Sequence, residues 1–114
     1  MDDEEFFKGR PEGRAIKGAV KEIGPSEIRV SKSQIGFYRR HPFAATWTPG
    51  RYLKGDVPPL VLSIFLRRRD GSPRWKKVGE PQPGRFTHHL ELRSAKELDD
   101  EVRSRLSEAP READ

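Results

Sequence analysis

The chain has 114 residues, of which 36% are charged and only 32% are hydrophobic. This length and composition predict one small domain, with an ordered core over about residues 6–109 and frayed termini. The sequence contains no cysteine, which excludes disulfides, thiolate metal sites and thiol nucleophiles.

The charge is distributed unevenly along the chain. The formal net charge is +5, but residues 29–93 hold fourteen Lys and Arg against four Asp and Glu, and both flanking segments are net acidic. A basic region of this kind can attract a nucleic acid or another polyanion. The N-terminus is acidic and precedes no long apolar segment, so we expect neither a signal peptide nor a membrane span. These features and the lack of cysteine favour a cytoplasmic protein.

The first predicted element is a helix that begins near Pro11 and ends at Gly24-Pro25. Its apolar face is formed by Ile16, Ala19, Val20 and Ile23. Three short strands are predicted next, over residues 27–31, 33–40 and 43–48. Alternation places Ile28, Val30, Ile35 and Phe37 toward the core. In the third strand it places Phe43, Ala45 and Trp47 on one shared face.

The longest apolar run follows Pro58-Pro59 and ends at Arg67. It predicts a central strand that is buried on both faces. One face carries Leu60, Leu62, Ile64 and Leu66. The other carries Val61, Ser63 and Phe65.

The remaining elements are a short edge strand over residues 74–78, an irregular stretch over 79–84 and a last strand over 85–92. The last strand has Phe86, His88, Leu90 and Leu92 on one face and Thr87, His89 and Glu91 on the other. A capping box formed by Ser94 and Glu97 predicts the start of a C-terminal helix, which Pro110 is expected to stop.

This order of elements predicts an α+β fold with an N-terminal helix, a roughly five-stranded and mainly antiparallel sheet, and a C-terminal helix. Both helices are expected chiefly on one face. The opposite face would carry Tyr38, Val61, Ser63, Phe65, His89 and Glu91. Such a half-apolar face needs a cover, which a loop, a ligand or a second copy of the chain could provide. We expect a weak symmetric homodimer that buries Phe65.

Several short motifs resemble those of one known family. They are Phe7-x-Gly9-Arg10-Pro11-Glu12, Gly24-Pro25, Lys32-Ser33-Gln34, Phe43-Ala44, Arg51-Tyr52-Leu53, Pro59-Leu60-Val61-Leu62-Ser63, Arg74-Trp75-Lys76 and His88-His89-Leu90-Glu91-Leu92. The chain resembles an uncharacterised bacterial domain of unknown function, some relatives of which are labelled "predicted transport protein". The resemblance implies a compact helix–sheet–helix domain and no particular activity, cofactor or catalytic residue.

Aromatic rings interspersed with cations make the best functional case, because rings can stack on bases while cations hold phosphate. We therefore predict a small binding module for an anionic ligand or a nucleic acid. Its candidate binding residues are Tyr38, Arg39, Arg40, Arg51, Tyr52, Arg67, Arg68, Trp75, Lys76 and His89. One alternative is a protein-interaction or homodimerisation module.

The other alternative is an enzyme of unknown reaction that uses His88 or His89. Adjacent residues of a strand point to opposite faces, so these two rings cannot converge on one metal ion. The better catalytic candidate is His89, with Glu91 on the same face. The sequence has no phosphate-binding glycine loop and no hydrolase or metalloprotease motif. We therefore predict no catalytic residues, no metal site and no cofactor.

Overall fold

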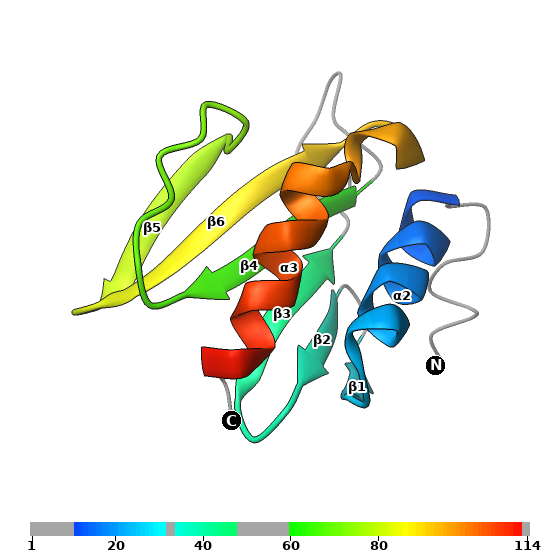
Figure 1. The fold of residues 1–114 in the computed structure, drawn as a ribbon, viewed down its shortest axis with the longest axis horizontal. Coiled ribbons are helices and arrows are strands. Elements are labelled where there is room, and N and C mark those ends of the chain that lie inside the picture. The colour runs from blue at the N-terminus through cyan, green and yellow to red at the C-terminus, as the bar shows by residue number, and fades with distance from the viewer. Residues whose placement is uncertain (1–10, 32–33, 48–59, 113–114) are drawn as a thin grey trace.

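The computed structural model describes residues 11–31, 34–47 and 60–112 (Figure 1). Its helices are α2 (Pro11–Ile23), the short 3-10 helix η2 (Ala95–Glu97) and α3 (Asp100–Glu112). Its strands are β1 (Glu27–Val30), β2 (Gln34–Tyr38), β3 (Pro42–Trp47), β4 (Leu60–Leu66), β5 (Lys77–Gln82) and β6 (Arg85–Leu92). The predicted α+β class is confirmed.

The strands form one sheet in the order β1-β2-β3-β4-β6-β5, and every neighbouring pair is antiparallel. The sheet thus has six strands where the sequence predicted roughly five. Both long helices cover the same face, which we call the helix face; the other is the open face (Figure 1). The N-terminal helix, the antiparallel sheet and the C-terminal helix were all predicted correctly.

The core lies between the helices and the helix face of the sheet. β4 is its centre, because it pairs with β3 on one side and β6 on the other. In this register Leu62 lies beside Thr46 and Leu90, all three of them buried. The helices contribute apolar side chains to the core, namely Ile16, Ala19, Val20, Val102, Leu106 and Ala109, and Leu98 between η2 and α3 joins them.

Two predictions in the strands are wrong. β5 begins later than predicted and runs through Gly79 and Pro81, where the sequence predicted irregular chain. Pro81 is tolerated because β5 is an edge strand, and the pairing with β6 shifts register between Gly79 and Gln82. The pairing of β2 with β3 also shifts register: Phe37 lies opposite Ala44 and Tyr38 opposite Pro42, so Phe43 is an extra residue of β3. This shift allows Phe43 to enter the core, 6.4 Å from the Phe37 ring, instead of sharing the face of Ala45.

The C-terminal helix also differs from its prediction. The capping box initiates η2, where the Glu97 carboxylate accepts hydrogen bonds from the backbone N–H groups of Arg93 and Ser94. A second cap, Asp99, then begins α3 by accepting from the Val102 N–H at 3.2 Å. α3 continues through Pro110, although a proline at this position cannot donate to the Leu106 carbonyl.

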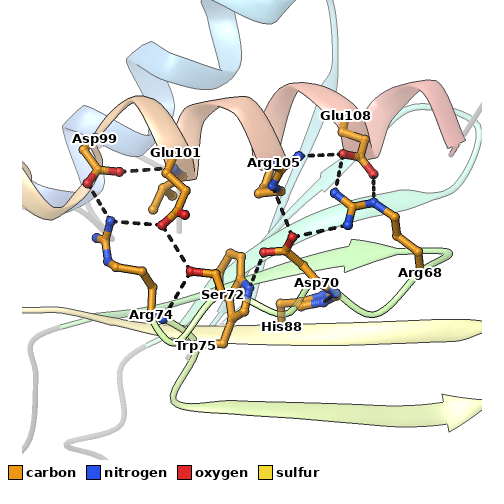
Figure 2. A network of polar contacts seen from close by, with 11 residues as sticks. Arg68, Asp70, Ser72, Arg74, Trp75, His88, Asp99, Glu101, Arg105 and Glu108 are labelled. Carbon is orange, nitrogen blue, oxygen red and sulfur yellow. Dashed lines mark hydrogen bonds and ion pairs between the residues drawn. The ribbon is translucent and has the colours of Figure 1, made fainter.

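The segment from Arg67 to Lys76, which we call the connector, joins β4 to β5. Figure 2 shows its residues between α3 and the sheet, so the connector shares the helix face with α3. Trp75 anchors it: the side chain is 8% exposed, and its indole packs edge-on against the His88 ring at a centroid distance of 5.1 Å. Trp75, one of the candidate binding residues, is therefore a core residue.

Candidate functional site

Three cationic segments meet at one end of the sheet. The turn between β2 and β3, the end of β4 and the start of β6 all lie at this end, because Tyr38 pairs with Pro42 and Leu66 pairs with Phe86. Figure 1 shows the C-terminal end of α3 on the same side of the molecule. We call this region the basic end. Its cationic and ionisable residues are Arg39, Arg40, His41, Arg67, Arg68, Arg69 and Arg85.

The basic end contains an open cleft of about 340 Å³. It is lined by His41, Pro42, Phe65, Leu66, Arg67, Pro81, Arg85, Phe86, Thr87 and Ala109. The adjacent residues Phe65 and Leu66 point to opposite faces of β4, so the cleft passes around the end of the sheet. Both phenylalanine rings are only partly buried, and the two arginines are exposed. None of these ten lining residues is acidic, so the described lining of the cleft combines apolar surface with positively charged side chains.

Arg68 faces away from this cleft and holds α3 to the connector. Its guanidinium makes two hydrogen bonds to the Glu108 carboxylate, at 2.8 and 2.9 Å, and a third to Asp70 at 3.2 Å (Figure 2). Arg105 also contacts both carboxylates. The hydrogen bonds from Arg68 lower the pKa of Glu108 and outweigh the effect of burial. Glu108 is therefore ionised and paired with Arg68 and Arg105.

Asp70 connects the ion pairs to the buried aromatic residues. Its carboxylate accepts a 2.8 Å hydrogen bond from the Trp75 indole, and its backbone N–H donates to Nε2 of His88. Burial on its own would raise the pKa of Asp70. The hydrogen bonds from Trp75 and Arg68 outweigh this effect, so the pKa lies below its usual value. His88 is fully buried in this arrangement. These contacts stabilise the connector and leave His88 out of reach of a substrate.

The open face carries a second polar group, which spans three strands. The Trp47 indole donates to Ser63 Oγ at 3.3 Å, and Ser63 Oγ lies 2.7 Å from Nδ1 of His89. Burial lowers the pKa of His89, and the charge of Lys77 lowers it further. Ser63 Oγ thus accepts from Trp47 and shares a second hydrogen bond with His89, in which the tautomer of the ring sets the donor. The hydrogen bond of His89 thus goes to Ser63 and not to Glu91.

A serine oxygen beside an imidazole nitrogen resembles a nucleophile with its general base. The surroundings argue against that role. Ser63 is 2% exposed, and it sits in the middle of a strand beneath the Trp47 indole. The hydroxyl already has two hydrogen-bond partners, so the three residues form a structural link across β3, β4 and β6.

Tyr38 is held on the open face by its neighbours. The Arg29 guanidinium lies 4.1 Å from the centroid of the Tyr38 ring, and the ring lies over Gly36. A Cβ atom at Gly36 would be 2.7 Å from Tyr38 Cε1, so only glycine leaves space for this ring. Arg29 also pairs with Glu27 at 2.8 Å, which partly neutralises its charge.

The other predicted binding residues are dispersed. The Arg39 guanidinium reaches Gly24 at the end of α2, and Lys76 lies beside a separate polar pocket at the opposite end of β6. Arg51 and Tyr52 lie outside the described residues. Of the predicted binding residues, Arg67 therefore lines the cleft, and Arg40 directly precedes the lining residue His41 in the sequence.

Sequence reasoning did not select His41, Arg85 or Phe86 as binding residues. The signal that could have found them is the register of the sheet, which places Arg85 opposite Arg67 one step beyond the Leu66–Phe86 pair. That register depends on which strands are neighbours in the sheet. Because β5 lies between β4 and β6 in the sequence, the sequence does not show that β4 and β6 pair directly.

Within residues 11–31, 34–47 and 60–112, no helix is long and apolar enough to cross a membrane. The same residues contain no group of three or more His, Asp or Glu side chains that could hold a metal ion. No curated protein matches the chain, and no solved structure does. The family model described as Domain of unknown function (DUF5655) matches residues 4–110. The chain therefore belongs to the DUF5655 family.

Proposed function

We propose that this protein is a small binding module for an anionic ligand, with its binding site in the cleft at the basic end. The observation that carries the proposal is the lining of the cleft, where Phe65 and Phe86 provide apolar surface and Arg67 and Arg85 provide positive charge. Ligand sites are typically concave, mostly apolar and equipped with a few polar groups that fix orientation. A ligand with a flat apolar part and a phosphate or carboxylate group matches this combination.

The charge balance around the cleft supports an anion over a neutral ligand. Asp70 and Glu108 are the described carboxylates nearest to Arg68, and both are paired with arginines. The Glu80 carboxylate accepts a hydrogen bond from the Gly84 N–H in the turn between β5 and β6. An anion entering the cleft would therefore meet the positive charge of Arg85 without displacing one of these acids.

The proposal can be tested with 1-naphthyl phosphate, which joins an aromatic ring to a phosphate. We expect it to bind more tightly than either 1-naphthol or inorganic phosphate, with NMR shift changes centred on residues 65–67 and 85–87. Arg67→Gln should raise the Kd about tenfold, the usual cost of losing a hydrogen bond to a charged group.

The matched control is Arg14→Gln, which neutralises an exposed arginine on α2 far from the cleft. It should leave the Kd unchanged. Equal weakening by both variants would show that the probe responds to net charge alone. Absence of shift changes at the cleft with all three compounds would overturn the proposal.

A further inference from the structure

The basic end extends beyond the cleft. Arg40 precedes the cleft residue His41, and Arg69 follows the cleft residue Arg67 by two positions. Both side chains are exposed, and neither makes a hydrogen bond or ion pair with any residue that the structure describes. Adjacent strands lie about 4.8 Å apart, so the line of cations from β2 through β3 and β4 to β6 covers about 14 Å. One phosphate group cannot contact all of it.

The cleft itself is of a size that suits one aromatic ring system. Its volume of about 340 Å³ is at the lower end of the range for small-molecule sites. Phe65 and Phe86 offer partly exposed rings, on which a base can stack without regard to its identity. Only an unpaired base can enter such a recess, because the bases of a duplex are stacked on one another inside the helix.

We propose that the ligand of this cleft is single-stranded nucleic acid, with one unstacked base in the cleft and the flanking phosphates on Arg40, Arg67 and Arg85. This inference rests on the proposed function and specifies its ligand class. The phosphates fix the position of the strand, and the phenyl rings select single strands over duplex. The described lining residues include no amide or carboxylate side chain that could read a base edge, so we expect no preference for a base sequence.

The experiment measures fluorescence anisotropy of labelled oligothymidine, oligouridine and a DNA hairpin duplex over a range of salt concentrations. Both single strands should bind, and the duplex should bind about tenfold more weakly, the contribution of one base–aromatic stack. Unlabelled 1-naphthyl phosphate should displace the single strands. Phe65→Leu keeps the apolar volume but removes the flat ring, and it should raise the Kd for oligothymidine about tenfold.

Arg85→Gln replaces an exposed side chain and therefore tests the same site without risk to the core. It should reduce the slope of log Kd against log salt by about 0.7, the value for one phosphate contact on a single strand. Arg14→Gln, the remote control, should leave that slope unchanged.

The outcomes separate this inference from the proposed function. If 1-naphthyl phosphate binds the cleft but the oligonucleotides neither bind nor compete with it, the ligand class is wrong and the proposed function stands. The inference also fails if duplex binds as tightly as single strands or if Phe65→Leu has no effect. If neither the probe nor any oligonucleotide binds, both proposals are overturned.

Discussion

The backbone N–H of Asp70 donates a 2.9 Å hydrogen bond to Nε2 of His88. An accepting nitrogen carries no proton, so the buried ring is neutral and protonated on Nδ1. Burial lowers the pKa of His88, and the charges of Arg68 and Arg69 add to this effect. The Ile64 backbone and the Asp70 carboxylate oppose the shift without reversing it. A neutral His88 therefore holds the connector against β6.

We predict that His88 makes stability depend on pH. Its folded-state pKa lies below the unfolded value of about 6.5, so the unfolded chain takes up a proton first as the pH falls. The stabilisation is complete above about pH 6.5 and is lost as the pH falls toward the folded-state pKa. Urea unfolding of the wild type should give a free energy of unfolding that decreases from about pH 7 to about pH 5.

The variant His88→Gln isolates this effect. Glutamine can still accept from the Asp70 N–H but does not titrate, so its free energy of unfolding should vary less with pH than that of the wild type. The remaining variation in this range includes the contribution of His89, whose pKa is also lowered. A His88→Gln protein that loses stability as steeply as the wild type would contradict the prediction.

Asp70 should be the most sensitive carboxylate of the network. Its side chain is 11% exposed and contacts Trp75, Arg68 and Arg105. Asp70→Asn removes the negative charge and leaves the two arginines without this partner. We expect a loss of about 3 kcal/mol in the free energy of unfolding, measured with urea at neutral pH.

The control for Asp70→Asn is Glu101→Gln. The Glu101 side chain is 46% exposed and lies 3.6 Å from Arg74, so its ion pair is screened by water. This variant should cost less than about 1 kcal/mol. Equal losses in the two variants would show that burial does not control the strength of this network.

The fold was largely predictable because its strands follow simple patterning. The run from Leu60 to Leu66 is apolar on both faces, and it became the central strand with neighbours on each side. Local rules failed where tertiary context decides the outcome. Pro81 enters a strand because that strand is at the edge of the sheet, and Phe43 enters the core because the pairing of β3 with β2 shifts register at this residue. Neither condition can be recognised from neighbouring residues.

The candidate site was less predictable, because residue type does not reveal the partner of a side chain. Arg67 and Arg68 are equivalent in sequence, but alternation sends one to the cleft and the other to Glu108. Trp75 was a candidate for stacking on a ligand, but its indole N–H instead donates a hydrogen bond to Asp70 beneath α3. Arg85 enters the cleft through strand pairing with β4, which joins segments separated by the connector and β5.

Gly36 and Tyr38 form a pair whose coupling can be measured. Gly36→Ala places a methyl group 2.7 Å from Tyr38 Cε1, so the ring must move away from its place beneath Arg29. Overpacking of this kind costs about 1–3 kcal/mol. Tyr38→Ala removes the clash, so the double variant should be less destabilised than the two single losses combined. Urea unfolding of all four proteins tests this, and strictly additive losses would show that the ring does not constrain position 36.

Self-association through the open face is expected to depend on Phe65. Val61, which the sequence also placed on the open face, is only 5% exposed within a single chain, whereas Phe65 remains partly exposed at the cleft. Burying a phenylalanine fully contributes about 1.5–3 kcal/mol, and a stable interface usually needs about 800 Å² from each partner. We therefore expect a weak, symmetric dimer that sedimentation velocity detects only at high protein concentration. Phe65→Ser should abolish it, and 1-naphthyl phosphate should compete with it, because both occupants cover the same ring. A wild type that stays monomeric at every concentration would exclude the dimer and leave Phe65 available to the ligand.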